Sequence, residues 1–286
     1  MEEIMSQDIY FGTEKKFSFK RSALNAVTRL HHLLIPNHAK KMGRKLLLTP
    51  VRTKPKNIEP KGLIKSKLNS SEGELSLYQL GSGPVWLMAH GWSGNSSQFF
   101  PLMEYIASQG FTAVAFDHPA HGESGGEHAH LPAFIEGLNA VLDAKENVVG
   151  VVAHSMGTAA VLECHHVKLE QVPLLLIAPV LNYTENLFRS IERSGYSIKL
   201  FKAIVGDIED KYQRSIDSFN PYQRLQQRTS QTIIVHDKKD RFSSFDLSKS
   251  ASDYIEHVTL YPTEKQGHGR VMSSKEAMKA FDDLNT

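Results

Sequence analysis

The stretch Val151-Val152-Ala153-His154-Ser155-Met156-Gly157 decides the fold. Its first half has the apolar, β-branched composition of a buried strand, and it runs directly into Ser-x-Gly. Small residues two before and two after the serine let the backbone turn tightly from strand to helix, which lifts the hydroxyl out of a sheet. The spacing therefore predicts a nucleophile elbow of the form A-x-S-x-G, with Ser155 at its tip.

Polar residues that could complete such a site follow in a fixed order. The chain order Ser155, Asp240, His268 differs from the orders in chymotrypsin-like and subtilisin-like proteases and is that of the α/β-hydrolase fold. The flanking stretches are the strand Pro84–Ala89 followed by His90-Gly91-Trp92, the strand Thr232–His236 followed by Asp237-Lys238-Lys239-Asp240, and the glycine-flanked loop Lys265–Gly269.

A further stretch, Phe116–Ser124, has the pattern D-x-P-x-H-G-x-S, with Ala120 where glycine is usual. With the A-H-S-M-G elbow it makes the chain, from about Leu75 to the C-terminus, resemble α/β-hydrolases of the carboxylesterase and monoacylglycerol-lipase-like branches. The resemblance implies a cofactor-free and metal-free serine esterase. It also implies that a small-molecule ester is the substrate.

Apolar strands and amphipathic helices alternate along the remaining chain, which predicts a mainly parallel sheet with helices on both faces. Between the last two predicted strands, residues 182–228 break this alternation and have a helical, amphipathic pattern. The resemblance places a small helical cap there, so we expect residues 71–286 to be the hydrolase domain with its cap. The expected strands are 75–80, 84–89, 112–116, 148–153, 174–178 and 232–236, and the expected helices are 97–109, 131–145 and 156–167.

The predicted chemistry is that of a Ser-His-Asp triad. Ser155 attacks an acyl carbonyl, His268 takes and returns its proton, and Asp240 orients the imidazole. Backbone N–H groups hold the negative charge that develops on oxygen. One donor is the residue after the nucleophile, Met156, and the resemblance makes Trp92 the other, with its side chain beside the substrate.

Two of these assignments have rivals. Asp237 also follows the strand, but the family pattern H-G-x-x-D aligns with His236–Asp240 and favours Asp240 as the acid. His257 is a weaker rival of His268, because it lies near a helix–strand boundary without loop glycines.

Other polar clusters have less specific signals. We interpret His90 and His154 as structural. Asp117, His118, His121 and Glu123 could form a metal set, but the loop motif favours a bracing role. Cys164, His165 and His166 are consecutive on the predicted helix and point in different directions, so a metal site is not expected there either.

Charge is unevenly distributed along the chain. Residues 1–67 contain 15 Lys/Arg and 5 Asp/Glu, whereas the chain as a whole has a net charge of only +2. No helix-turn-helix, zinc spacing or aromatic-basic module accompanies these cations, so nucleic-acid binding is not expected. The single cysteine favours a reducing cytoplasm, and no secretory signal or spanning apolar run is visible.

The basic segment, residues 1–70, is predicted to form a helix over Ser18–Leu34 followed by a proline-rich connector. Its apolar positions, Phe19, Val27, Leu30 and Leu34, recur at helical spacing. We expect this helix to pack on the hydrolase domain or a neighbouring subunit. Docking on an anionic membrane is the alternative. The oligomeric state is left open.

Three functions remain compatible with the sequence. Hydrolysis of carboxylic esters through an acyl-enzyme is the first. The same triad could instead serve C–C bond hydrolysis, thioester hydrolysis or acyl transfer. A non-catalytic ligand-binding protein on the hydrolase fold is the third, since fold alone does not fix function.

Overall fold

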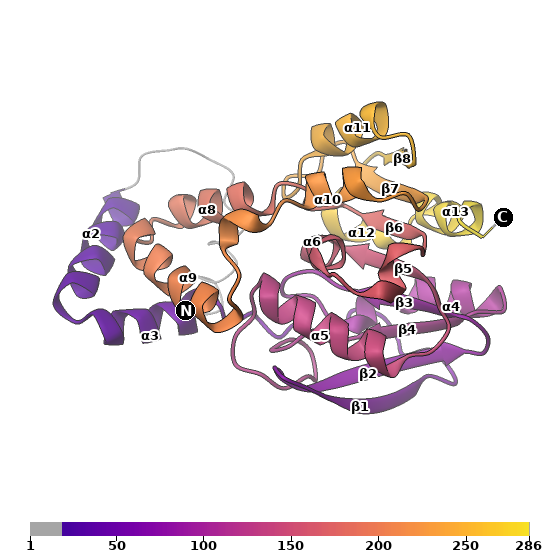
Figure 1. Cartoon of the computed structure of the whole chain (residues 1–286), viewed down its shortest axis with the longest axis horizontal. Helices are drawn as coiled ribbons and strands as arrows, with labels where there is room; N and C mark the ends of the chain where they lie inside the picture. Colours follow the sequence, from indigo (N-terminus) through magenta and orange to yellow (C-terminus); the bar gives the residue numbers. More distant parts are fainter. Residues whose placement is uncertain (1–18, 286) are drawn as a thin grey trace. The chain divides into compact units, whose positions relative to one another are not determined.

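The computed structural model describes residues 19–285, and its internal contacts divide the chain into two compact units. The larger comprises residues 52–181 and 221–286, and the smaller comprises residues 1–51 and 182–220. Figure 1 shows the larger unit built around a sheet and the smaller one built from helices. The sequence-based boundaries at residue 70 and at 182–228 stay predictions.

The larger unit contains an eight-stranded sheet in the order β1-β2-β4-β3-β5-β6-β7-β8 within the described residues. Strands β3 to β8 are parallel, and β2 is antiparallel to both β1 and β4. This arrangement confirms the predicted α/β class and its mainly parallel sheet. The strands are β1 (Ile64–Ser70), β2 (Gly73–Gly81), β3 (Val85–Ala89), β4 (Thr112–Phe116), β5 (Val148–His154), β6 (Leu174–Ile177), β7 (Thr232–Asp237) and β8 (Val258–Thr263).

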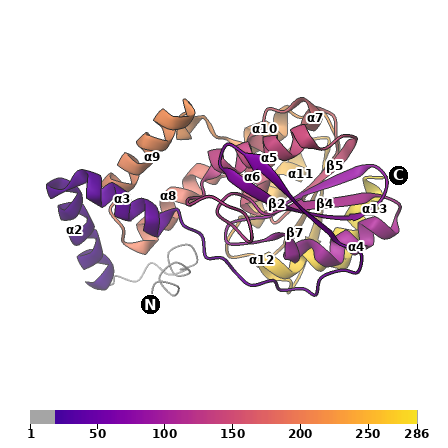
Figure 2. The ribbon, with the colours of Figure 1, turned by 90° about the horizontal axis from the view of Figure 1, so that it is seen from below.

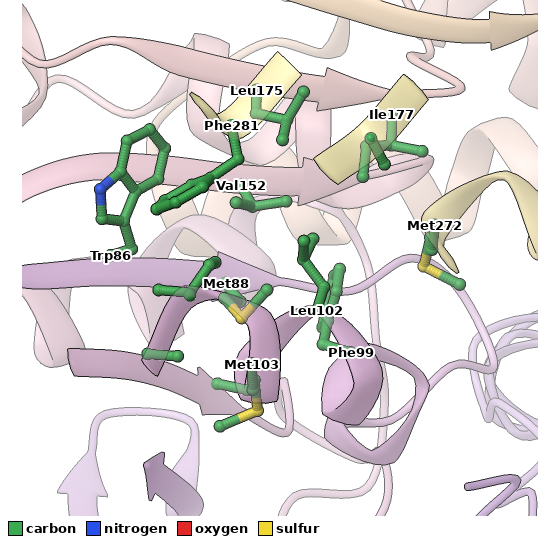
Figure 3. Packing of buried hydrophobic residues seen from close by; sticks show 14 of the residues in the cluster. Trp86, Met88, Phe99, Leu102, Met103, Val152, Leu175, Ile177, Met272 and Phe281 are labelled. Carbon is green, nitrogen blue, oxygen red and sulfur yellow. The ribbon is translucent and has the colours of Figure 1, made fainter. Parts of the chain in front are cut away.

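Helices cover both faces of this sheet, as predicted (Figure 2). On one face, the apolar side chains of β3, β5 and β6 pack with α4 and α13, and Trp86 meets Phe281 edge-on at 5.0 Å between ring centroids (Figure 3). On the other face lie α5 and α6. The helices of this unit are η1 (Ser96–Phe99), α4 (Phe100–Ser108), α5 (Leu131–Ala144), α6 (Met156–Glu163), α7 (Val167–Glu170), α10 (Pro221–Gln227), α11 (Phe245–Tyr254), α12 (Gly267–Arg270), η3 (Val271–Ser273) and α13 (Lys275–Asp283).

The sheet topology brings chemistry-bearing loops to one edge. Strands β3, β5 and β7 are parallel and in register, so their carboxyl ends lie at the same edge of the sheet. The residues that follow these ends are His90, Ser155 and the loop from Lys238. Ligand sites of open α/β sheets form at this edge.

The smaller unit is helical and has its own apolar core. It contains α2 (Phe19–Leu34), α3 (Pro36–Leu47), α8 (Tyr183–Ser194), α9 (Ile198–Tyr212) and η2 (Ile216–Ser218). Its core joins α3 to α8 and α9, and the buried side chains include Ala39, Leu47, Ile191, Leu200, Phe201 and Ile204. Lys40 and Arg44 of α3 also form ion pairs with Asp207 of α9.

Two helix boundaries differ from the sequence prediction. Helix α6 ends at Glu163, so Cys164 and His165 follow the helix instead of lying on it. Helix α2 ends at Leu34 as predicted, but Pro36 then begins α3, a helix that was not predicted. Proline suits the first position of a helix, where its missing N–H has no partner to lose. Ser18, the predicted first residue of α2, lies outside the described part of the chain, as do residues 1–17, for which no helix or strand was predicted. Within residues 19–285, no helix has both the length and the apolar composition needed to cross a membrane.

Candidate active site

Ser155 stands on the predicted sharp turn between β5 and α6. Its backbone has φ 52° and ψ −124°, a conformation that non-glycine residues adopt at a cost and that concentrates at functional sites. Gly157 allows the turn to approach β3, since a Cβ at this position would lie 2.6 Å from the His90 carbonyl oxygen. Gly91 is restricted in the same way, since a Cβ there would lie 2.6 Å from the Ser155 Cβ. These two glycines bring the serine against the loop after β3.

The structure brings Ser155, His268 and Asp240 into one hydrogen-bonded chain. His268 Nε2 lies 2.9 Å from Ser155 Oγ, and its Nδ1 lies 2.7 Å from Asp240 Oδ2. A carboxylate can only accept, so the Nδ1–H donates to Asp240 and leaves Nε2 to accept the serine hydroxyl proton. The Asp240 side chain is fully buried, whereas 15% of the His268 side chain is exposed. This is the hydrogen-bond order in which an imidazole acts as a general base toward a hydroxyl.

Asp240 stays ionised despite its burial. Burial by itself would raise the pKa of this carboxyl, but hydrogen bonds from His236 and His268 outweigh it and hold the pKa far below its usual range. The other oxygen, Oδ1, accepts the backbone N–H groups of Phe242 and Ser243 at 2.7 and 3.2 Å. Asp240 is therefore a fixed negative charge beside the imidazole.

Asp237, the rival carboxylate, is placed differently. It is fully buried and accepts the N–H groups of Lys239 and Gln266 at 3.0 and 2.7 Å and the hydroxyl of Thr263 at 3.2 Å. Burial would raise its pKa, but these hydrogen bonds lower it below the usual value. Asp237 thus ties the end of β7 to the residue before α12, and this short helix, not the predicted loop, carries His268. Asp237 has no hydrogen bond to the imidazole among the contacts of the described residues.

Two other histidines have contacts that keep them apart from proton transfer. The ring of His257, the rival base, pairs through Nε2 with the Leu225 carbonyl at 3.0 Å. His154 donates from Nε2 to the His268 carbonyl at 2.9 Å, so it supports the backbone of the residue that contacts Ser155. Burial, followed by the nearby His268, lowers the pKa of His154 to about 3.

Two neutral histidines support the loop that follows β3. His90 Nδ1–H donates to the Gly91 carbonyl at 2.7 Å, and its Nε2 accepts the N–H of His118 at 3.0 Å. His121 Nδ1–H donates to the Pro119 carbonyl at 2.9 Å, and its Nε2 accepts the N–H of Ser93 at 3.0 Å. Each ring must carry its proton on Nδ1 alone, because Nε2 accepts from a backbone N–H. The loop containing Trp92 is therefore fixed on both sides.

The start of the larger unit supports the same loop. Thr53 Oγ1 donates to the Ser93 carbonyl at 3.1 Å, and Asn95 Nδ2 donates to the Thr53 carbonyl at 3.0 Å. Asn57 Nδ2 donates to the Ser97 carbonyl at 2.8 Å. The proline-rich connector of the sequence is thus extended but hydrogen-bonded to the hydrolase unit over this stretch.

Asp117, a member of the possible metal set, is occupied by other groups. Its carboxylate accepts the N–H and hydroxyl of Ser96 at 2.7 and 2.8 Å, the N–H of Glu123 at 2.8 Å and the Tyr78 hydroxyl at 3.1 Å. Beside it, His118 stacks on Phe134 with ring centroids 3.9 Å apart. Between residues 19 and 285, no three His, Cys, Asp or Glu side chains group as a metal site requires.

Two contacts of Asp240 were not predicted. His236 Nε2 lies 3.3 Å from Asp240 Oδ2, and Ser243 Oγ lies 3.2 Å from the same oxygen. His236 is fully buried at the end of β7, and Ser248 Oγ lies 2.7 Å from its Nδ1. The sequence signal was present, since a histidine ends an apolar strand four residues before the acid, but the pattern did not say toward which group the ring points.

The buried histidines predict a steep acid sensitivity of stability. Burial lowers the pKa of His90, His118, His121 and His154. Below the ordinary histidine pKa of about 6.5, the unfolded chain takes up protons that the folded chain excludes, so the free energy of unfolding falls as pH drops. Each such ring adds up to about 1.4 kcal/mol per pH unit. We expect urea unfolding between pH 7.5 and 5.5 to show this slope.

His118→Leu tests the origin of that slope. Neither ring nitrogen of His118 has a hydrogen-bond partner among the described residues, so leucine removes a titrating group without breaking a hydrogen bond and keeps an apolar side chain against Phe134. The variant should be at least as stable as the parent at pH 5.5 and should show a shallower pH dependence. The exposed His165→Leu is the matched control and should keep the slope of the parent. An unchanged slope in His118→Leu would contradict the prediction.

Comparison with protein families gives one match. The family model described as serine aminopeptidase, S33, matches residues 84–269, which include the elbow, the loop with Asp240 and the position of His268 on α12. No curated protein sequence matches the chain.

Solved structures of hydrolases share the fold at low sequence identity. An esterase from Pyrococcus furiosus is 17% identical, with a TM-score of 0.63 over 83% of this chain and 98% of that one. The esterase Est1E from Butyrivibrio proteoclasticus, solved with ferulic acid bound, is 17% identical, with a TM-score of 0.61 over 76% and 97% of the two chains. A thioesterase domain from the curacin biosynthetic pathway is 16% identical, with a TM-score of 0.58 over 79% and 100%.

Proposed function

The chain belongs to the serine aminopeptidase family S33 of α/β-hydrolases, and we propose that within this family it is a serine esterase using Ser155, His268 and Asp240. The observation that supports the proposal is the continuous hydrogen-bonded chain from Ser155 Oγ through His268 to Asp240 at the carboxyl edge of the sheet. A strained serine backbone, a correctly protonated imidazole and a fixed carboxylate are the parts that nucleophilic catalysis needs.

In the proposed reaction, His268 Nε2 removes the proton of Ser155 as its Oγ attacks the acyl carbonyl carbon. The carbonyl π bond opens to an oxyanion, and the backbone N–H groups of Met156 and Trp92 stabilise it. Collapse of this intermediate breaks the ester C–O bond, and His268 returns the proton to the leaving alcohol. Water then attacks the acyl-enzyme by the same route and releases the acid and free Ser155. Asp240 stabilises the imidazolium in both halves.

A fluorophosphonate probe tests the proposal directly. The probe reacts covalently with an activated serine, so the parent protein should be labelled at Ser155 and Ser155→Ala should not be labelled. A fold-matched but inactive binding protein would give no labelling in either case, and that result would contradict an enzymatic function. Labelling at another residue would contradict the assigned nucleophile.

A substrate panel then separates the chemistries. We expect hydrolysis of p-nitrophenyl esters with a burst of p-nitrophenol equal to the enzyme concentration where deacylation limits turnover. Acyl thioesters, a β-diketone and an aminoacyl p-nitroanilide represent thioester, C–C and peptide-bond hydrolysis. We compare kcat/KM across the panel. If kcat/KM for one of these three substrates exceeds that of every ester by about tenfold or more, the ester assignment is wrong. Tenfold corresponds to a difference of about 1.4 kcal/mol in activation free energy.

A further inference from the structure

Two polar side chains of helix α2 form hydrogen bonds to the rest of its unit. Thr28 is the buried residue of this helix, and its Oγ1 accepts the N–H of Ser197 at 3.1 Å. Asn25 Nδ2 donates to the Tyr196 carbonyl at 3.4 Å. A surface helix of a water-soluble unit ordinarily turns its apolar face inward. In α2, Leu24 is half-buried, and the other large apolar side chains are exposed.

The apolar side chains of α2 lie together on the exposed side. At 100° per residue, the exposed large apolar positions of the helix fall within a sector of roughly 120°, opposite Thr28, whereas the half-buried Leu24 lies outside this sector. The side chains in this sector are more than half exposed, and so is that of Ile35, which follows the helix. We call these residues the apolar stripe: Phe19 (81%), Val27 (64%), Leu30 (55%), Leu33 (77%), Leu34 (68%) and Ile35 (57%). A run of large apolar side chains of this extent marks an interaction surface.

The charge around the stripe has one sign. Residues 19–51 contain seven Lys/Arg, three His and no Asp or Glu. Lys20 and Arg29 are exposed and fall at the two edges of the stripe on the helical wheel. A second copy of this chain meeting the stripe through a two-fold interface would bring together two segments that both have basic edges and contain no Asp or Glu. The basic edges instead complement a negatively charged surface.

We propose that the apolar stripe and its basic edges dock on an anionic phospholipid bilayer, with α2 lying in the interfacial plane. Apolar side chains on one side with Lys/Arg at its margins are the composition of helices that bind in this way. Membrane anionic lipids attract such cations, and the apolar side chains enter the headgroup boundary. The sequence left two partners open for this helix, protein or membrane, and the exposure of the stripe favours the membrane. The proposal does not depend on the hydrolase activity.

Vesicle co-sedimentation tests this docking with the full-length protein. One set of vesicles contains phosphatidylcholine alone and the other about one quarter phosphatidylglycerol. We expect the protein to pellet with the anionic vesicles at low salt and to stay largely in the supernatant with the neutral ones. Leu30→Asp combined with Leu33→Asp should weaken the apparent affinity at least about tenfold, because each substitution removes an apolar contact and adds like charge to the surface. Lys20→Gln combined with Arg29→Gln should weaken it several-fold and flatten its salt dependence.

Val167→Asp is the matched control, because Val167 is 72% exposed on the other unit. It should bind vesicles like the parent. Circular dichroism and ester hydrolysis without vesicles should be unchanged in all variants, so a loss of binding cannot come from unfolding. The proposal is overturned if the parent fails to pellet with anionic vesicles at low salt, or if the leucine variant binds as well as the parent. Light scattering tests the alternative of a dimer. The proposal is also overturned if the parent is a dimer, the leucine variant is a monomer and neither protein binds vesicles.

Discussion

Ser155→Ala should lower the turnover of a p-nitrophenyl ester by about 10⁴–10⁶-fold and leave the fold intact. Alanine keeps the backbone turn and its Cβ but removes the oxygen that lies 2.9 Å from His268 Nε2. Loss of this one hydrogen bond at a partly exposed position costs about 1 kcal/mol, equivalent to roughly 2–4 °C in melting temperature for a chain of this size. Steady-state kinetics and a thermal melt of the purified variant measure both effects.

Ser108→Ala is the control for this experiment. Ser108 is exposed at the end of α4, and its hydroxyl donates only to the backbone carbonyl of Tyr105 among the described contacts. This variant should retain the full rate. A Ser155→Ala protein that keeps more than about a tenth of the parental rate would refute Ser155 as the nucleophile, because a triad serine accounts for several powers of ten.

The strands that carry the site were predictable because they are buried on both faces. Strands β3, β4, β5 and β7 are continuous apolar runs, and such runs have few structural alternatives when they alternate with helices. Two edge strands were not predicted. The first, β1, has the sequence IKSKLNS and is mostly exposed, and β8 contains Pro262, which is tolerated only where a strand lacks a neighbour on one side. Edge strands do not need an apolar pattern, so the sequence carries little signal for them.

The positions in the site were predictable to different degrees. Elbow spacing and flanking glycines single out Ser155 and His268 because tight turns restrict which residues can stand there. The support of the loop after β3 was only partly visible. Its bracing role was expected from the motif, but the hydrogen bonds of His90 and His121 depend on how two separate loops meet. Side-chain direction at a loop is a property of tertiary packing and is not encoded in local spacing.

Helix α2 shows the same limit in another form. Periodicity correctly predicted the helix, and it correctly grouped Phe19, Val27, Leu30 and Leu34 on one face. Periodicity alone does not say whether that face is turned inward. In the structure these side chains are exposed, and Thr28, on the opposite side of α2, is buried and forms a hydrogen bond to Ser197. An amphipathic pattern therefore predicts a face, and only the fold shows what the face contacts.

The choice between Asp237 and Asp240 leads to the second large effect. Asp240→Asn should lower kcat/KM for an ester by roughly 10⁴-fold at neutral pH, because an amide cannot fix the imidazole tautomer or stabilise its positive charge. The Asp240 carboxylate lies 2.7 Å from His268 Nδ1, and its backbone partners Phe242 and Ser243 hold it in place. The chain offers a matched comparison in Asp237→Asn, a change of the same size three residues away.

Asp237→Asn should act mainly on stability. Its carboxylate accepts hydrogen bonds from Lys239, Gln266 and Thr263, and an amide has one accepting oxygen in place of two. Leaving a buried donor without its acceptor costs about 1–3 kcal/mol, which thermal or urea unfolding measures. Activity should fall by no more than about tenfold in this variant, through looser placement of His268. Equal losses of kcat/KM in the two variants, or a larger loss in Asp237→Asn, would show that Asp240 is not the residue that stabilises the imidazolium.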